Sequence, residues 1–414
     1  MTGPDESDWT FRASPKIAPT AERSVPPEQT EERVRRVLPL LPVTRISDLT
    51  PLDPIRLPVF SVVTPMARDL TTHMGKGRDA VSARVSALME AVERISAETA
   101  PEGSTRRARF CELAGDPRCP AVDPVSLDLP GDSEYAPDRE ITWIESQDLL
   151  TGRPVLVPAD LVLSPPREGV LRDVDTNGLA AGNTRLEAVV HALCEVIERD
   201  LLAQMELIAL FGDPADPPLP LPEVELSSLP ESAGEWVERL HAAGLDVAIH
   251  DITGEPGVAT FQAVVSDYRY PTPTGPAPFH FPGWGTAPNA ETALLRAVTE
   301  AVQARLGRIL GARDAFNVTP FGSRAATRAE RRRRVAPRSR VPFARTPTFE
   351  SQDLAADLDF LLDRLAASGF RHVLVTDLTR RDLDIPVVRV RVPGLSSFYV
   401  NRRRIGWRCL RHLL

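Results

Sequence analysis

Apolar residues along this chain recur at two spacings, one typical of helices and one typical of strands. Apolar positions three and four residues apart predict long helices at 78–100, 184–210 and 289–310. The other predicted elements are a short helix at 31–41, strands at 57–65, 257–267 and 385–394, a β-hairpin at 141–158 that turns at Thr151 and Gly152, and helix-then-strand pairs at 236–253 and 357–379. Strands interleaved with long helices predict an α+β or α/β fold in which sheets and long helices pack together.

The first long helix carries a polar face of an ordinary kind. Successive helical residues turn by about 100°, so positions i, i+4 and i+7 share one face. That face holds Ser86, Glu90 and Glu93, opposite an apolar face. Taken alone, this pattern predicts an amphipathic helix whose glutamates lie in water.

The second long helix differs, because apolar residues cover most of its circumference. Its polar stripe consists of Glu187, His191, Glu195 and Glu198. A helix that is apolar nearly all round is largely buried, so its carboxylates need partners. His191 by itself is more typical of a packed core histidine than of a ligand. Cys194 is expected to point away from the stripe into the core.

The third long helix repeats this arrangement, with Arg296, Glu300 and Gln303 on one stripe. Acidic stripes on three helices must converge or be neutralised separately, because clustered carboxylates repel one another and take up protons unless cations lie among them. Lysine is scarce nearby, and Mg²⁺ prefers carboxylates together with substrate phosphate. Arg94 and Arg199 also lie on or beside the stripes and suit phosphate. We therefore infer a magnesium-bridged phosphate site between helices.

Composition and short motifs exclude several classes of protein. The chain has 414 residues and a net charge of −8, which argues against non-specific nucleic-acid binding. Its four cysteines match no zinc or redox spacing, and no run of 18 apolar residues occurs. Neither a Walker A loop nor a Rossmann fingerprint is present, since "MGKGRD" at 74–79 lacks the required frame. We expect a cytoplasmic protein that binds neither nucleic acid nor membrane.

Two segments are expected to be poorly ordered. Residues 1–30 are polar and rich in proline, which predicts a loosely held N-terminal segment ahead of a single domain at 31–414. The basic run at 324–340 predicts a mobile, solvated loop at about 322–346, with a patch for an anionic partner as the alternative.

Three long motifs resemble those of the YcaO superfamily, in the same order and over roughly residues 15 to 400. They are "GKGRDAVSARVSALMEAVER", "TNGLAAGNTRLEAVVHALCEVIERD" and "ETALLRAVTEAVQARLGRILGARD". The stretch "TDLTRRDLDIPVVRVRVPGL" is similar to the family's C-terminal strand region. Within the family, residues 43–65 and 311–314 look most like the compact type that works alone or is found near TfuA-like proteins. The resemblance implies a YcaO fold with ATP and Mg²⁺ between the helices.

The resemblance also implies roles for individual residues. Glu90, Glu93, Glu195, Glu198 and Glu300 would be the metal-side carboxylates. The cofactor-binding residues would be Arg23, Thr30, Lys76, Ser86, Asn183, Glu187, Arg199, Arg296 and Gln303. Among these, Arg199 and Arg296 would contact phosphate and, with Glu195 and Glu198, form the catalytic group. The chain departs from the family at Thr286, where compact relatives carry histidine, and it ends without the Pro-x-Pro-x-Pro tail of partner-dependent azoline makers.

By resemblance, the activity is ATP-dependent activation of a peptide backbone amide. The first hypothesis is a stand-alone cyclodehydratase that forms an azoline or a macroamidine in a ribosomally made precursor peptide. The second is a thioamide-forming enzyme that works with a TfuA-like sulfur-delivery partner. Two alternatives of another class are a non-catalytic ATP-binding scaffold that presents a peptide and a structural ion cluster without nucleotide. Whether the chain forms a homodimer stays open.

Overall fold

The computed structural model describes residues 9–171, 175–212, 221–267, 280–311 and 339–414. Its helices are α1 (Pro27–Val37), α2 (Ala80–Ser96), α3 (Phe110–Leu113), α4 (Arg185–Phe211), α5 (Glu231–Ala242), α6 (Ala290–Leu310), α8 (Leu354–Ala367) and α9 (Trp407–Leu410). Its strands are β1 (Arg45–Asp48), β2 (Val59–Val63), β3 (Thr72–Lys76), β4 (Thr105–Arg109), β5 (Glu140–Asp148), β6 (Arg153–Pro158), β7 (Leu179–Ala181), β8 (Glu223–Val224), β9 (Asp246–Asp251), β10 (Thr260–Ser266), β11 (His280–Thr286), β12 (Arg340–Val341), β13 (Leu374–Asp377) and β14 (Val387–Arg391).

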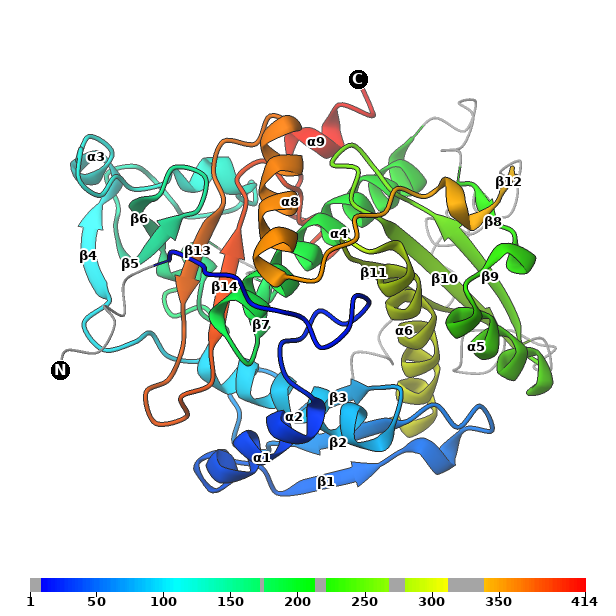
Figure 1. Cartoon of the computed structure of the whole chain (residues 1–414). Helices are drawn as coiled ribbons and strands as arrows, with labels where there is room; N and C mark the ends of the chain where they lie inside the picture. Colours follow the sequence, from blue (N-terminus) through cyan, green and yellow to red (C-terminus); the bar gives the residue numbers. More distant parts are fainter. Residues whose placement is uncertain (1–8, 172–174, 213–220, 268–279, 312–338) are drawn as a thin grey trace.

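The strands form three sheets that surround the long helices (Figure 1). One sheet has the order β1-β2-β3, and a second has the order β11-β10-β9-β8-β12. The third has the order β4-β5-β13-β14-β7, with β6 paired to β5. Helix α2 packs on β2 and β3, α6 on β10 and β11, and α4 on β14, β7 and α8. The expected α+β fold is therefore confirmed.

Most predicted elements lie where the apolar pattern places them. The three long helices begin at Ala80, Arg185 and Ala290, within a few residues of the predicted starts. The predicted hairpin is β5 and β6, and Gly152 in its turn has φ of 66°. The short helix was predicted too late in the chain, because Pro27 begins α1 and the apolar pattern alone does not mark that start.

Three strand–helix units share one local design: β3 with α2, β7 with α4, and β11 with α6. Each helix begins at a side-chain cap, which is Asp79, Thr184 or Asn289, and the cap oxygen accepts a backbone N–H three residues on. Glycine in the strand, or directly after it at Gly182, lets each helix approach closely. A Cβ built on Gly75 would lie 2.0 Å from the Ala87 nitrogen of α2.

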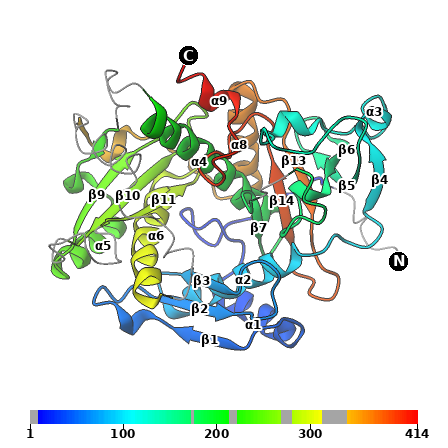
Figure 2. The same cartoon turned by 180° about the vertical axis from the view of Figure 1, so that it is seen from behind.

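The N-terminal segment, which we define as residues 9–26, is held more firmly than its composition indicates. Lys16 Nζ lies 2.7 Å from a buried oxygen of Asp357 on α8, and the Lys16 backbone N–H donates to Gln352. Farther along, Thr292 on α6 donates to the carbonyl of Thr20. In both views the segment runs through the space between α2, β7 and α6 (Figures 1 and 2). Tertiary hydrogen bonds therefore order residues that carry little apolar pattern.

Two further sequence expectations concern the basic run and membrane-spanning helices. The basic run falls largely on residues 312–338, which lie outside the described residues. Within the described ranges, none of the helices combines the length and the apolarity that a membrane crossing requires.

Candidate functional site

The three strand–helix units carry their polar site residues at the same distances in sequence from the helix cap. Seven residues after each helix cap stand Ser86, His191 and Arg296. Eleven residues after the cap stand Glu90, Glu195 and Glu300, and fourteen residues after it stand Glu93, Glu198 and Gln303. Because these offsets are close to whole helical turns, each helix presents the three positions on one face. The predicted site residues of the three helices are thus equivalent positions of a repeated unit.

The glutamate at the middle position is bound in a similar way in all three units. The backbone N–H of Met74 donates to Glu90 at 3.0 Å, and that of Gly178 donates to Glu195 at 3.3 Å. The backbone N–H of Trp284 donates to Glu300. A strand N–H thus orients each carboxylate, which leaves lone pairs for a further partner.

Burial raises the pKa of several of these carboxylates and so favours their protonated forms. Burial is the main cause that raises the pKa of Glu93 well above its usual range, with Glu195 and Glu90 adding repulsion. The pKa of Glu195 is also raised, mainly by burial. Burial together with Glu300 and Glu195 raises the pKa of Glu198 to about 7. Without a bound cation, the site therefore carries more carboxylates than its own arginines neutralise.

Ion pairs join the glutamates to the cations that the sequence assigned to phosphate. Arg199 Nη1 lies 2.9 Å from Glu198, and Lys76 Nζ lies 3.0 Å from Glu300. Although burial opposes charge on Glu300, Lys76 and Arg199 outweigh it and lower its pKa. Cations and carboxylates therefore neutralise one another in pairs across the site.

Arg296 is bound to the N-terminal segment. Its Nη2 donates to the buried carboxylate of Glu22, and its Nη1 donates to the carbonyl of Thr286 at 2.8 Å. It also hydrogen-bonds the side chain of Cys194. Cys194 is buried in the core as expected, but it does not face away from the stripe, because it lies seven positions after Glu187 and so returns to the same helix face.

Glu187 fastens the N-terminal segment to α4. One of its oxygens accepts from the Ser24 backbone N–H and hydroxyl, both at 2.6 Å. The other accepts from the backbone and side-chain amides of Asn183 at 2.8 and 2.9 Å. Thr30 donates to the Asn183 side-chain oxygen at 2.9 Å, and Arg23 donates to the carbonyl of Glu22 at 2.8 Å. The structure thus brings Thr30, Asn183 and Glu187 into one cluster.

The remaining predicted contacts are less tightly bound. Ser86 is exposed on α2. Gln303 Nε2 donates to the carbonyl of Met74 at 2.9 Å, which ties α6 to β3. Sequence reasoning did not single out Glu22 or Ser24. Neither lies in a periodic element, so no helical or strand pattern marks them.

The five metal-side glutamates do not form a ready-made cage. Among the described residues, no three His, Cys, Asp or Glu side chains converge closely enough to hold a metal ion. Each carboxylate is instead drawn to a neighbouring cation or backbone N–H. The donor set nevertheless fits Mg²⁺, because it consists of carboxylate oxygens, and the raised pKa values of Glu93, Glu195 and Glu198 show that negative charge there is under-compensated.

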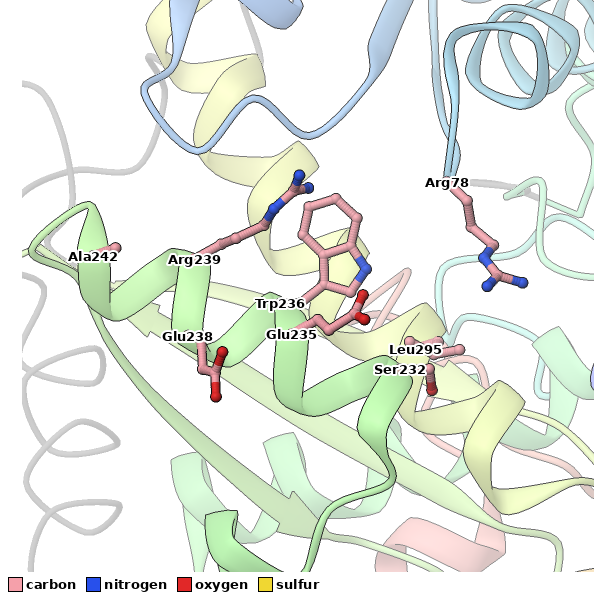
Figure 3. A pocket seen from close by; sticks show the side chains of 8 residues that line it. All are labelled: Arg78, Ser232, Glu235, Trp236, Glu238, Arg239, Ala242 and Leu295. Carbon is pink, nitrogen blue, oxygen red and sulfur yellow. The ribbon is translucent and has the colours of Figure 1, made fainter.

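A cavity of about 640 Å³ lies on the other flank of α6 (Figure 3). Its lining comes from α5, from Leu295 on α6 and from Arg78 in the loop before α2. Trp236 lines it from α5, and the Arg239 guanidinium stacks over that ring at 4.8 Å. This cavity contains none of the predicted metal-side glutamates, so it is distinct from the carboxylate site.

Comparisons with known proteins agree with this geometry. The chain is 37% identical over 399 residues to an uncharacterised protein of Methanothermobacter thermautotrophicus, covering 93% of this chain and 98% of that protein. It is 32% identical over 410 residues to an uncharacterised protein encoded in the tfuA 3′ region of Rhizobium leguminosarum bv. trifolii, covering 93% and 91%.

Solved structures give the same fold. YcaO from Methanopyrus kandleri, bound with AMPPCP and Mg²⁺, superposes with a TM-score of 0.74 at 28% identity, over 95% of this chain and 98% of that one. A heterocyclase in complex with substrate and cofactor superposes with a TM-score of 0.76 at 24% identity, over 94% of this chain and 54% of that one, and this likeness supports the fold alone.

A family model described as YcaO cyclodehydratase, ATP- and Mg²⁺-binding, matches residues 74–396. That range contains all three strand–helix units and every predicted metal-side glutamate. The expected cofactors, ATP and Mg²⁺, are those of the family. Because the match spans most of the sequence and the fold agrees, this chain belongs to the YcaO family.

Proposed function

We propose that this protein activates a peptide backbone amide by transferring a phosphoryl group from ATP to the amide oxygen. A nucleophile attacks the amide carbon, the resulting oxyanion takes the phosphoryl group, and phosphate then leaves with that oxygen. Without phosphorylation the amide oxygen would be a poor leaving group. Catalysis of such a transfer consists mainly of positioning and of neutralising charge.

One observation carries this proposal: the site pairs cations with carboxylates, both between elements and along α4. Lys76 with Glu300 and Arg199 with Glu198 are two such pairs. A magnesium–triphosphate complex offers each member a new partner, because the metal ion attracts the carboxylates and the phosphates attract the cations. A purely structural ion cluster would not explain why Glu198 and Glu195 still have raised pKa values.

The roles proposed for individual side chains follow from this exchange. The magnesium-holding group would be Glu90, Glu93, Glu195, Glu198 and Glu300. The cations that orient and neutralise the phosphates would be Lys76, Arg199, Arg296 and Arg23. The groups that position the rest of the nucleotide would be Thr30, Ser86, Asn183, Glu187 and Gln303. These groups would act within one catalytic domain that spans residues 31–414.

Cyclodehydration is the first candidate outcome. The family description names this reaction, and the fold is shared with a heterocyclase. In this case the nucleophile belongs to the peptide: a Cys, Ser or Thr side chain next to the amide gives an azoline, and the peptide's own N-terminus gives a macroamidine. The substrate would be a ribosomally made precursor peptide.

Thioamide formation is the second candidate outcome, and a specific observation favours it. The relative from Rhizobium leguminosarum is encoded in the tfuA 3′ region. A TfuA-like protein would then deliver the sulfur nucleophile, and the carbonyl oxygen would leave as phosphate while sulfur takes its place. The activation step and the residues that perform it are the same for both candidates.

Mass spectrometry of a peptide substrate separates the candidates. The purified protein is incubated with ATP, Mg²⁺ and the short peptide encoded beside its gene, with and without sulfide or a TfuA-like protein. Loss of one water without sulfide supports cyclodehydration, and exchange of oxygen for sulfur supports thioamide formation. Glu195→Gln is expected to abolish either change. ATP binding without any turnover would favour the non-catalytic scaffold, and a peptide modified equally by wild type and Glu195→Gln would contradict the role proposed for Glu195.

A further inference from the structure

His191 stands at a position of α4 that nucleotide-facing residues occupy in the other two units. It lies seven residues after the Thr184 cap, as Ser86 does after Asp79 and Arg296 after Asn289. It also lies one turn from Glu187 and one turn from Glu195, between two site residues on the same face. Its place in the repeat is therefore that of a ligand-facing side chain.

One of the two ring nitrogens of His191 has no hydrogen-bond partner in the described part of the chain around it. Its Nδ1 atom is buried and has no partner among the described residues. Buried polar atoms nearly always have a partner, so an exception calls for a specific reason. Simple core packing, which the sequence favoured for this histidine, does not supply one.

The charges near His191 are those of the proposed phosphate site. Burial is the main cause that lowers the pKa of His191 well below its usual range, and Arg296, Arg23 and Lys76 lower it further. Three cations from three separate elements thus lie near enough to His191 to disfavour its protonated form. A neutral imidazole carries one N–H donor, which can donate to a phosphate oxygen without competing for the carboxylates nearby.

We propose that His191 is a nucleotide-contact residue, which donates a hydrogen bond from its neutral ring to the phosphates held by Arg23, Lys76 and Arg296. This inference rests on the proposed nucleotide site and adds a contact to it. The repeat then has a consistent chemistry at its first position, where Ser86, His191 and Arg296 each present a hydrogen-bond donor from one of the three helices.

Nucleotide binding tests this role without any peptide. Calorimetry with AMPPCP and Mg²⁺ is carried out on wild type, His191→Phe, His191→Ala and His191→Gln. Because a hydrogen bond to a charged phosphate is lost, we expect the Phe and Ala variants to bind roughly tenfold to a hundredfold more weakly. Gln keeps an N–H donor of similar reach, so its affinity is expected to stay within about threefold of wild type.

Matched controls separate contact from stability. His241 lies exposed on α5, so His241→Phe is expected to leave nucleotide affinity unchanged. The unfolding temperature of each variant without nucleotide reports any structural cost of the substitution. If the Phe variant folds poorly, the Ala variant, which adds no volume, is compared with the Gln variant instead.

The outcomes distinguish this inference from the proposed function. Wild-type affinity in both the Phe and Ala variants, or a Gln variant as weak as they are, would overturn the role of His191 alone. A wild-type protein that binds no AMPPCP would overturn the nucleotide site itself and the role of His191 with it.

Discussion

Lys76 and Glu300 lie 224 positions apart in the chain, yet the Lys76 ammonium is 3.0 Å from a Glu300 oxygen. The pair joins the end of β3 to the middle of α6, and so links two of the three strand–helix units. The Lys76 side chain is 20% exposed, which leaves it open to a ligand. We expect bound nucleotide and Mg²⁺ to replace this ion pair, because a phosphate would bind Lys76 and the metal ion would bind Glu300.

Chemical labelling of lysine tests that replacement. Lys16 and Lys76 are the only lysines in the sequence. The Lys16 side chain is 1% exposed and paired with Asp357, so it serves as an internal control. An amine-reactive acylating reagent is expected to modify Lys76 and not Lys16, and AMPPCP with Mg²⁺ is expected to protect Lys76. Peptide mass spectrometry measures both sites, and equal labelling of Lys76 with and without nucleotide would contradict the replacement.

Glu22 is paired with Arg296, which we propose binds phosphate, so removing the charge of Glu22 is expected to strengthen nucleotide binding. The Glu22→Gln variant no longer offers a charged partner, so AMPPCP is expected to bind roughly tenfold more tightly, as measured by calorimetry. Glu32→Gln makes the same change in an exposed pair with Arg36 on α1 and should have no effect. Weaker binding in Glu22→Gln would instead show that Glu22 orients Arg296 for the nucleotide.

The raised pKa of Glu198 predicts two opposite responses to pH. Its value of about 7 lies above the ordinary 4.5, so the folded metal-free protein binds more protons than the unfolded chain between these values. The free energy of unfolding of the metal-free protein should therefore decrease as pH rises from 4.5 to 7. Mg²⁺ requires the deprotonated carboxylate, so its affinity should increase over the same range.

Glu198→Gln provides the control for both responses. Denaturant unfolding without metal and calorimetry with Mg²⁺ are each measured across roughly pH 4 to 8, a range that contains both the ordinary value of 4.5 and the raised value of about 7. In this variant, the part of the pH dependence that Glu198 contributes should be absent from both the free energy of unfolding and the Mg²⁺ affinity. A Mg²⁺ affinity in wild type that does not change with pH would rule out Glu198 as a group that exchanges a proton for metal.

Close packing of β11 against α6 makes Gly283 intolerant of a side chain. A Cβ at this position would lie 2.1 Å from the Ala301 nitrogen and 2.4 Å from the Ala297 oxygen, both in helix backbone. Gly283→Ala is therefore expected to cost about 3 kcal/mol in the free energy of unfolding, because the helix must move away from the sheet. Gly115→Ala, with no atom within 4 Å of the added Cβ, is the control in denaturant unfolding. An equal cost in the two variants would contradict this packing.

Local patterns were enough to predict the long helices and the faces that carry their acidic stripes. The stripe of α4 is an example, because Glu187, Glu195 and Glu198 share a face through helical geometry alone. The same reasoning favoured a packed core histidine at His191, where we propose a ligand-facing one. One helix viewed alone does not distinguish the two, whereas the alignment of the three caps supports our proposal.

The sequence by itself determined the repeated unit of strand, cap and acidic helix, since each of its features depends on residues within about five turns of one another. Only the tertiary structure decided which carboxylate meets which cation. Glu22 reaches Arg296, and Lys76 reaches Glu300, because the path of the chain brings separate units together. No periodicity encodes such pairs, whose existence depends on the packing of α2, α4 and α6 around the N-terminal segment and on the low dielectric that this packing creates.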